Sequence, residues 1–296
     1  MTDPRPIGLF DSGIGGLTVL REVQSRLPGE STIYIGDSAR HPYGTRSDAE
    51  VRTFAEELSD ELVGRGVKAM IIACNTATAV ALEHLRERHP STPIIGVIRP
   101  GAAAAALATR TNRVGVLATI ATVRTRAYFA AIKDENPAIV VLERAASELV
   151  PLIESGQTES EAITAAVQSA LHPLLTDDQS DRIDTLLLGC THFPLIRRAI
   201  GGAITTPIAI VDSAAATASF LQQVIAVNGL EAPGSSRGTA ADAGAEGHTA
   251  PAQVAVEPTH EFFTTGDTLM VEALVQRLFG GPGIRALPIV LGADRR

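Results

Sequence analysis

A series of short aliphatic runs, each followed by a helix-like pattern, constrains the fold of this chain more than any other feature. Each run is rich in Ile, Val and Leu and ends in small or polar residues. Such runs are typical of parallel strands buried on both faces, and the intervening helices supply the crossovers that parallel strands need. The sequence therefore predicts an α/β fold with mainly parallel sheets, with strands at Ile7–Phe10, Thr32–Ile35, Ala69–Ala73, Ile94–Val97, Val114–Leu117, Ile139–Leu142, Thr185–Leu188 and Ala209–Val211.

Two pairs of similar segments indicate that the chain contains two copies of one unit. IGLFDS at 7–12 resembles VGVLAT at 114–119, and IACNT at 72–76 resembles LGCTH at 188–192. The segments occur in the same order and at similar separations, which is the signature of an internal repeat. We therefore expect two pseudo-symmetric α/β domains with an active site in the cleft between them. The first would comprise residues 1–98 plus 207–296, and the second residues 99–206.

One stretch interrupts the alternation of strands and helices. Residues 231–259 are rich in Gly, Ala, Ser and Pro and have no apolar period, so we expect a flexible insertion there. After it, residues 261–267 predict a strand and a turn, and residues 268–279 have the apolar spacing of a helix. The chain therefore returns to a folded core at its end.

Composition and charge exclude several classes of function. The formal net charge is −8 and basic residues do not cluster, so we expect no nucleic-acid partner. The longest apolar stretches, such as Ala102–Ala108, are far shorter than the ~20 residues of a membrane-spanning helix. Met1–Pro6 lacks the basic and apolar segments of a secretory signal. We therefore expect a cytoplasmic protein with no membrane partner.

The only two cysteines, Cys74 and Cys190, follow buried strands in corresponding places of the two copies. In a reducing compartment they are expected to be thiols rather than a disulfide. Ligands of parallel α/β sheets bind beyond the carboxyl ends of the strands, and a helix N-terminus favours a thiolate. One such cysteine would be explained as a small buried core residue, but two at matching sheet ends are harder to explain by packing.

Two thiols at such positions suit the transfer of a proton between the two faces of one carbon atom. Inverting an amino acid requires a base on one face and an acid on the other. Cysteine serves as either because its reference pKa is about 8.5. Asp11 and His192 lie at the corresponding strand ends and are candidates to bias the two sulfurs. Each also has a structural interpretation, Asp11 as a helix cap and His192 as a structural histidine.

The polar groups of a substrate also need partners. Loops that lead into helix N-termini supply amide donors without basic side chains, although each residue there could simply be a helix cap. Gly13–Gly16 resembles a phosphate loop but lacks the Lys-Ser/Thr of a P-loop and the spacing of a dinucleotide fingerprint, so we expect no nucleotide there. The candidate substrate-binding residues at strand ends are Ser12, Asn75, Thr76, Thr119, Thr122 and Thr191.

Four segments together resemble the signature segments of bacterial glutamate racemases. The resemblance covers nearly the whole chain except residues 231–259. The pairing of a Cys-Asn-Thr with a Gly-Cys-Thr-His at this separation is far more specific than any one segment. The four segments are FDSGIGGLTV at 10–19, GDS at 36–38 with PYG at 42–44, ACNTA at 73–77 and LGCTHFPL at 188–195.

The resemblance implies a racemase that interconverts L- and D-glutamate, uses neither pyridoxal phosphate nor a metal, forms a homodimer and supplies D-glutamate for peptidoglycan. Cys190 would deprotonate L-glutamate and Cys74 D-glutamate, with Asp11 and His192 assisting. The substrate-binding positions implied by the resemblance are Asp11, Ser12, Pro42, Tyr43, Gly44, Asn75, Thr76, Thr119, Thr122, Thr191 and His192.

Three further residues stand at or beside positions where the resemblance is weaker. Glu154 matches an acidic position near the site, although Ala146-Ser147 replaces the Cys-Pro that commonly precedes that segment. His41 and Arg99 occupy positions that vary within the family. The resemblance would place these two residues at the rim of the cleft or at the dimer contact.

Three other interpretations remain open on the sequence alone. An aspartate racemase of the same superfamily would share both cysteines, but the Cys-Asn-Thr and Cys-Thr-His flanks favour glutamate. A non-catalytic binding protein with this fold would show no turnover. A thiol nucleophile or redox switch would form a covalent adduct or a Cys74–Cys190 disulfide, neither of which racemisation requires.

Overall fold

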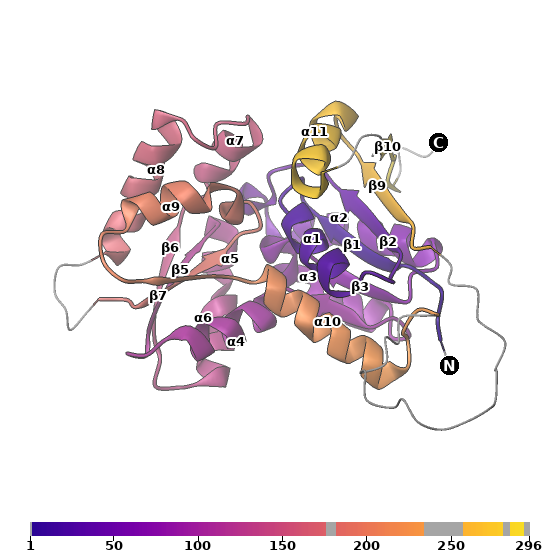
Figure 1. The fold of residues 1–296 in the computed structure, drawn as a ribbon, viewed down its shortest axis with the longest axis horizontal. Helices are drawn as coiled ribbons and strands as arrows, with labels where there is room; N and C mark the ends of the chain where they lie inside the picture. Colours follow the sequence, from indigo (N-terminus) through magenta and orange to yellow (C-terminus); the bar gives the residue numbers. More distant parts are fainter. Residues whose placement is uncertain (1, 176–181, 234–256, 281–284, 293–296) are drawn as a thin grey trace, which may run out of the picture.

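The protein folds into two parallel sheets covered by helices, as Figure 1 shows. The computed structural model describes residues 2–175, 182–233, 257–280 and 285–292. All paired strands run parallel, so the expected α/β fold is confirmed, and every strand expected from an aliphatic run is present with ends shifted by a few residues. The strands are β1 (Ile7–Asp11), β2 (Thr32–Gly36), β3 (Ala69–Ile72), β4 (Ile94–Gly96), β5 (Arg113–Ala118), β6 (Val140–Ala145), β7 (Thr185–Gly189), β8 (Ala209–Asp212), β9 (His260–Thr264) and β10 (Ala286–Pro288).

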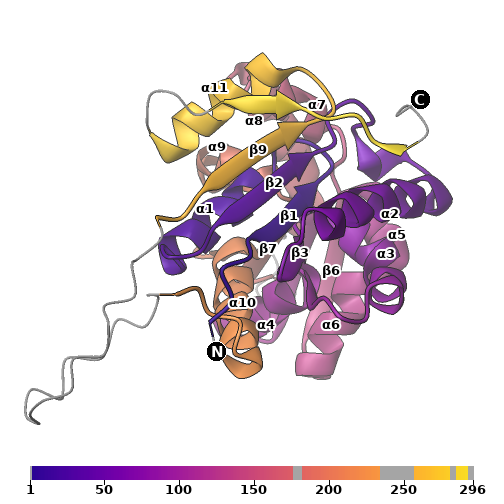
Figure 2. The same ribbon diagram turned by 90° about the vertical axis from the view of Figure 1, so that its right-hand side faces the viewer.

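The two sheets repeat one strand order. The first is β10-β9-β2-β1-β3-β4 and the second is β6-β5-β7-β8, so β2-β1-β3-β4 recurs as β6-β5-β7-β8. The first sheet also has two strands without a counterpart in the second sheet, β9 and β10, and Figure 2 shows β9 beside β2. In this repeat β3 corresponds to β7. We call the part of the molecule built around the first sheet the first unit and the part built around the second sheet the second unit. Cys74 and Cys190 follow β3 and β7 and therefore hold equivalent places in the two units.

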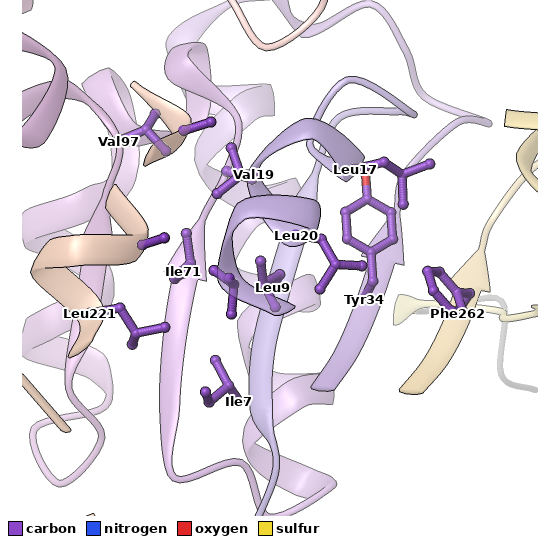
Figure 3. Packing of buried hydrophobic residues seen from close by; sticks show 14 of the residues in the cluster. Ile7, Leu9, Leu17, Val19, Leu20, Tyr34, Ile71, Val97, Leu221 and Phe262 are labelled. Carbon is purple, nitrogen blue, oxygen red and sulfur yellow. The ribbon is translucent and has the colours of Figure 1, made fainter. Parts of the chain in front are cut away.

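Helices cover both faces of the sheet in the first unit. Ile7 and Leu9 of β1 face a core that includes Leu17 and Leu221, as Figure 3 shows, whereas Phe10 faces the opposite core. This alternation follows from the two-residue period of a strand, and burial on both faces explains the continuous aliphatic runs. The helices of this unit are α1 (Leu17–Arg26), α2 (Asp48–Gly64), α3 (Asn75–Arg88), α10 (Ala214–Asn228) and α11 (Thr268–Phe279), with a 3₁₀ turn η1 (Tyr43–Thr45).

The second unit has the same layered construction around a shorter sheet. Leu117 and Leu188 face one core and Val116 and Leu187 face the other. Its edge strands β6 and β8 are only partly buried, unlike the central strand β7. The helices are α4 (Ile98–Ala108), α5 (Ile120–Thr125), α6 (Ala127–Glu135), α7 (Leu149–Glu154), α8 (Glu161–Leu171) and α9 (Arg197–Ala203), with 3₁₀ turns η2 (His172–Leu174) and η3 (Phe193–Ile196).

The boundary expected near residue 207 lies too early. Strand β8 pairs with β7 and so belongs to the second sheet. The chain joins the first unit only with α10, whose Ala214 and Leu221 lie in the core of that unit. The aliphatic run of β8 looks like any other strand in the sequence, and its pairing partner is fixed by tertiary packing.

The end of the chain returns to the first sheet. Strand β9 pairs with β2, and α11 begins and ends at the expected residues Thr268 and Phe279. Strand β10 extends the sheet further and was not expected. Most of the expected insertion at 231–259 lies outside the described residues. Among the helices that are described, none is both long and apolar enough to cross a membrane.

Candidate active site

The carboxyl ends of the central strands of both units meet at one small buried cavity. Its volume is about 20 Å³, which is room for about one water molecule. None of the described residues that line it is a lysine or an arginine, so its polarity comes from thiols, hydroxyls, amides and imidazoles. The lining residues are Ser12, His41, Pro42, Tyr43, Gly44, Thr45, Cys74, Asn75, Thr76, Thr119, Ser147, Val150, Cys190, Thr191 and His192.

Cys74 caps the N-terminus of α3. Its sulfur accepts a hydrogen bond from the Ala77 N–H at 3.4 Å, and its thiol donates to the Ser12 hydroxyl at 3.6 Å. Burial and the nearby Asp11 carboxylate raise the pKa of Cys74 to about 12, against the smaller opposing effects of these two hydrogen bonds. In this closed cavity Cys74 is therefore a protonated thiol at neutral pH.

Cys190 lies beside an imidazole. Its sulfur is 3.7 Å from Nδ1 of His192, and Nε2 of the same ring is 2.7 Å from Oε1 of Glu154. Burial alone would lower the pKa of His192, but the contacts with Cys190 and Glu154 outweigh it and raise that pKa well above the ordinary 6.5. His192 is therefore an imidazolium that can donate one N–H to Glu154 and the other to the Cys190 sulfur.

Glu154 contacts two imidazoles. Its Oε2 is 2.8 Å from Nδ1 of His41, while its Oε1 is the partner of His192. Burial tends to raise the pKa of Glu154, but the hydrogen bonds from the two histidines prevail and lower it to about 2. Ligand atoms of the three residues lie within 4.8 Å of one another, which is compact enough for a metal ion. Since both carboxylate oxygens already accept imidazole hydrogen bonds, we describe the trio as a hydrogen-bonded relay.

Asp11 connects the two units behind the cavity. It is fully buried, and its carboxylate accepts hydrogen bonds from the Gly13 N–H at 3.1 Å and from the Thr191 hydroxyl at 3.2 Å. The close approach depends on Gly15, since a Cβ there would lie 2.5 Å from Thr191 Oγ1 and 2.6 Å from His192 Nδ1. Asp11 therefore acts on Cys74 as a nearby charge while it holds a residue of the second unit.

Hydroxyl and amide groups fill the opposite side of the cavity. The Oγ1 atoms of Thr76 and Thr119 are 2.9 Å apart, and those of Thr119 and Thr122 are 3.1 Å apart, which links α3 to the N-terminus of α5. Asn75 accepts a hydrogen bond from Tyr128 at 2.6 Å, which fixes the orientation of its amide. Its Nδ2 is buried and has no hydrogen-bond partner among the described residues. That donor is free for a ligand.

Tyr43 and Gly44 bring the loop after β2 against the second unit. The Tyr43 hydroxyl is bound to the buried carboxylate of Asp37, which also accepts a hydrogen bond from Thr265 at 2.7 Å. A Cβ on Gly44 would lie 2.8 Å from Thr119 Cβ, so only glycine allows this approach. The backbone of this loop therefore forms one wall of the cavity.

Comparisons with known proteins agree with this architecture. A model of the Asp/Glu/hydantoin racemase family matches residues 16–221. The chain belongs to this family. A glutamate racemase of Neisseria gonorrhoeae is 49% identical over 226 residues, which cover 76% of this chain and 82% of the relative. A glutamate racemase isoform of Bacillus anthracis has a crystal structure with a TM-score of 0.84 and 35% identity over 97% of each chain.

A second racemase structure contains an amino acid. The glutamate racemase of Francisella tularensis, in complex with D-glutamate, has a TM-score of 0.81 and 31% identity over 97% of this chain and 98% of its own. Membership of this racemase family makes the chain an isomerase. The resemblance noted from the four sequence segments is therefore confirmed at the level of the family.

The structure brings nearly all of the candidate residues together. Those expected to bind substrate line the cavity, apart from Asp11 and Thr122, which lie behind Thr191 and Thr119 respectively. Glu154 also lies behind the cavity wall, as the partner of His192. The Arg99 side chain is 71% exposed and pairs with Asp134 on α6. It does not line this cavity.

Four residues that line the cavity were not among the expected site residues. His41 was expected at the rim or a dimer contact, Ser147 was noted only as part of the Ala146-Ser147 departure, and Thr45 and Val150 were not considered. His41 directly precedes the Pro42-Tyr43-Gly44 segment, which was a signal of proximity to the site. Its partner Glu154 lies in the other unit and is distant in sequence. Tyr128, which orients Asn75, was also missed because only the tertiary fold brings α6 to α3.

Proposed function

We propose that this racemase interconverts L- and D-glutamate by proton transfer to and from two thiols, and that its product enters peptidoglycan synthesis. One observation carries the proposal: Cys74 and Cys190 occupy equivalent positions of two repeated units and line the same buried cavity. A base on one side of a carbon atom and an acid on the other is the arrangement that inversion requires.

The two sulfurs would exchange roles with the direction of reaction. From L-glutamate, the Cys190 thiolate removes the α-proton, so the C–H bond breaks and an S–H bond forms. The Cys74 thiol then delivers its proton to the opposite face of the carbanion and becomes the thiolate. The raised pKa of Cys74 suits that donor, and the imidazolium of His192 can stabilise negative charge on the Cys190 sulfur. The reverse reaction starts from Cys74.

Glutamate would be held by neutral donors. Its carboxylates need hydrogen bonds, and the cavity offers the hydroxyls of Ser12, Thr76 and Thr191 as well as the unpartnered Nδ2 of Asn75. A carboxylate on that Nδ2 would satisfy a buried donor that otherwise carries a desolvation cost. The choice of glutamate is supported by the relatives named above, including the one with D-glutamate bound.

The size of the cavity implies that the units separate to admit substrate. A volume of about 20 Å³ holds about one water molecule and is far too small for an amino acid. The contacts that close it, Thr191 with Asp11 and His41 with Glu154, join the two units. We infer that the structure represents a closed arrangement and that these contacts open and reform in each cycle.

Following the sequence resemblance, we propose further that the protein acts in the cytoplasm as a homodimer and needs neither pyridoxal phosphate nor a metal. The acid/base groups described above are sufficient for the chemistry, because thiols can supply both proton-transfer roles.

A turnover assay tests this function directly. Purified protein that has been dialysed against a chelator, with no pyridoxal phosphate added, should abolish the circular dichroism of L-glutamate and yield an equal mixture of enantiomers. L-aspartate should react far more slowly. Activity that depends on an added metal or pyridoxal phosphate would contradict the cofactor-free mechanism, and comparable turnover of L-aspartate would contradict the choice of glutamate.

A further inference from the structure

We propose that His41 is a positioning residue of this enzyme: through Glu154 it fixes His192 beside Cys190, and it does so from across the cleft. The inference rests on the proposed function, because it concerns the acid/base step at Cys190. Its observable consequence is that loss of His41 impairs proton transfer at the Cys190 sulfur and not at the Cys74 sulfur.

The contacts form one continuous chain. His41 Nδ1 is 2.8 Å from Glu154 Oε2, Glu154 Oε1 is 2.7 Å from His192 Nε2, and His192 Nδ1 is 3.7 Å from the Cys190 sulfur. The ring centroids of the two histidines are 5.7 Å apart. Each carboxylate oxygen thus has its own imidazole, and the bond to His41 determines how the carboxylate faces His192.

Glu154 needs such an anchor. It is the last residue of the six-residue helix α7, and its long side chain reaches inward to a place where only 15% of it remains exposed. Fixing a glutamate side chain costs rotamer entropy, and leaving one carboxylate oxygen there without a partner carries a desolvation cost. The bond to His41 offsets both. Gly13 leaves the necessary space, since a Cβ there would lie 2.6 Å from Glu154 Oε1.

His41 belongs to the other unit. It lies in the loop between β2 and η1, whereas Glu154 and His192 belong to the second unit. Its Nε2 is buried without a hydrogen-bond partner among the described residues, so Nδ1 makes the polar contact that fixes the ring. Because this contact joins the units, the relay to Cys190 is complete only when the cleft is closed.

The other sulfur has different partners. Cys74 is hydrogen-bonded to Ser12 and to the Ala77 N–H, and both of these groups belong to the first unit. Loss of the His41 contact should therefore impair proton transfer at Cys190 and leave transfer at Cys74 nearly intact.

The test compares two substitutions of one residue. His41→Asn keeps an N–H donor at the place of Nδ1, whereas His41→Leu removes it. With both cysteines present, His41→Leu should lower kcat/KM for racemisation by about 10- to 100-fold, as expected for a misplaced catalytic group. His41→Asn should stay within about threefold of the wild type. Equal damage by both variants, or no damage by either, would overturn the proposal.

The same pair of variants should then be placed on single-cysteine backgrounds. In deuterated water, His41→Leu should slow α-hydrogen exchange of L-glutamate by Cys74→Ser protein. It should leave exchange of D-glutamate by Cys190→Ser protein within about threefold. An equal effect on both would show that His41 merely shapes the cavity or closes the cleft, which contradicts its assignment to the Cys190 side.

A spectroscopic measurement remains decisive if the protein turns over no glutamate. The His192 Nε2–H held by Glu154 should give a slowly exchanging, downfield proton signal in NMR spectra of histidine-labelled protein. We expect the signal to broaden or vanish in His41→Leu and to persist in His41→Asn. An unchanged signal in His41→Leu would overturn the positioning role, whereas absent racemisation with the expected NMR result would contradict only the proposed function.

Discussion

The two units share a strand order but surround their cysteines with different chemistry. Strands β2-β1-β3-β4 and β6-β5-β7-β8 place Cys74 and Cys190 at equivalent sheet ends. Cys74 then caps α3 beside a hydroxyl, and its pKa is raised to about 12. Cys190 instead lies beside an imidazolium that is itself bound to a carboxylate. The repeated scaffold sets where the sulfurs are, and the loops that follow each strand set their proton chemistry.

This difference follows from the residues that come after β3 in the first unit and after β7 in the second. Asn75-Thr76-Ala77 begins a long helix at once, so a free N–H of its first turn, that of Ala77, donates to the Cys74 sulfur. Thr191-His192 leads only into the 3₁₀ turn η3, which brings an imidazole back to Cys190. Pseudo-symmetry therefore does not require the two sulfurs to have the same hydrogen-bond partners, and a racemase working in both directions can use two sulfurs with unlike surroundings.

The largest expected effect comes from removing either sulfur. Cys74→Ser and Cys190→Ser should each lower racemisation of glutamate by roughly 10²- to 10⁴-fold, because a serine hydroxyl cannot replace a thiol as acid or base near neutral pH. Circular dichroism of L- and D-glutamate measures the loss, and urea unfolding checks that each variant folds. A variant that retains more than a tenth of the activity would show that its sulfur is dispensable.

The second prediction concerns the relay at Cys190 and its pH dependence. The folded pKa of His192 is raised, so its contribution to stability is present below about pH 6.5 and is lost as pH rises toward the folded pKa. Glu154, whose pKa is about 2, stays ionised over this range. Glu154→Gln removes a cause of the raised His192 pKa, so the variant should be less stable than the wild type at pH 6.5.

That difference in stability should then shrink with rising pH. The free energies of unfolding of the two proteins should approach each other by up to about 1.4 kcal/mol per pH unit above pH 6.5. Urea denaturation at pH 6.5, 7.5 and 8.5 measures this convergence. A difference that is constant or grows with pH would contradict the assignment of an imidazolium to His192.

The smallest effect is expected away from both sulfurs. Arg99 is 71% exposed and pairs with an exposed Asp134. Arg99→Ala should change the free energy of unfolding by less than about 1 kcal/mol and leave racemisation within about twofold. Urea unfolding and the circular dichroism assay measure both. A tenfold loss of activity would show that a residue outside the cavity influences the proton transfer at Cys74 or at Cys190.

Much of this fold was predictable because its signals are local. Continuous aliphatic runs gave β1 to β8, and the matched Cys74 and Cys190 segments predicted two units facing one site. The boundary at 207 failed because the strand β8 does not reveal its pairing partner. Strand β10 was missed because it is a short edge strand, Ala286–Pro288, whose proline is unusual in a strand.

The residues of the cavity were predictable one by one, but their contacts were not. Sequence patterns placed Asp11 and His192 near the sulfurs, yet gave no indication that Asp11 binds Thr191 or that Glu154 bridges two histidines. The Asp11–Thr191 and His41–Glu154 contacts join the two units, so they depend on the docking of one unit against the other. No local period or cap encodes such a contact.

Hydrogen exchange by the single-cysteine variants tests the central claim most directly. In deuterated water, Cys74→Ser protein should exchange the α-hydrogen of L-glutamate and not of D-glutamate, and Cys190→Ser protein should show the opposite preference, both followed by proton NMR. Wild-type protein should place deuterium in each newly formed enantiomer from its first turnover, because the incoming proton comes from the opposite thiol. Exchange of both enantiomers by one single-cysteine variant would mean that one base serves both faces, and it would contradict the two-thiol account.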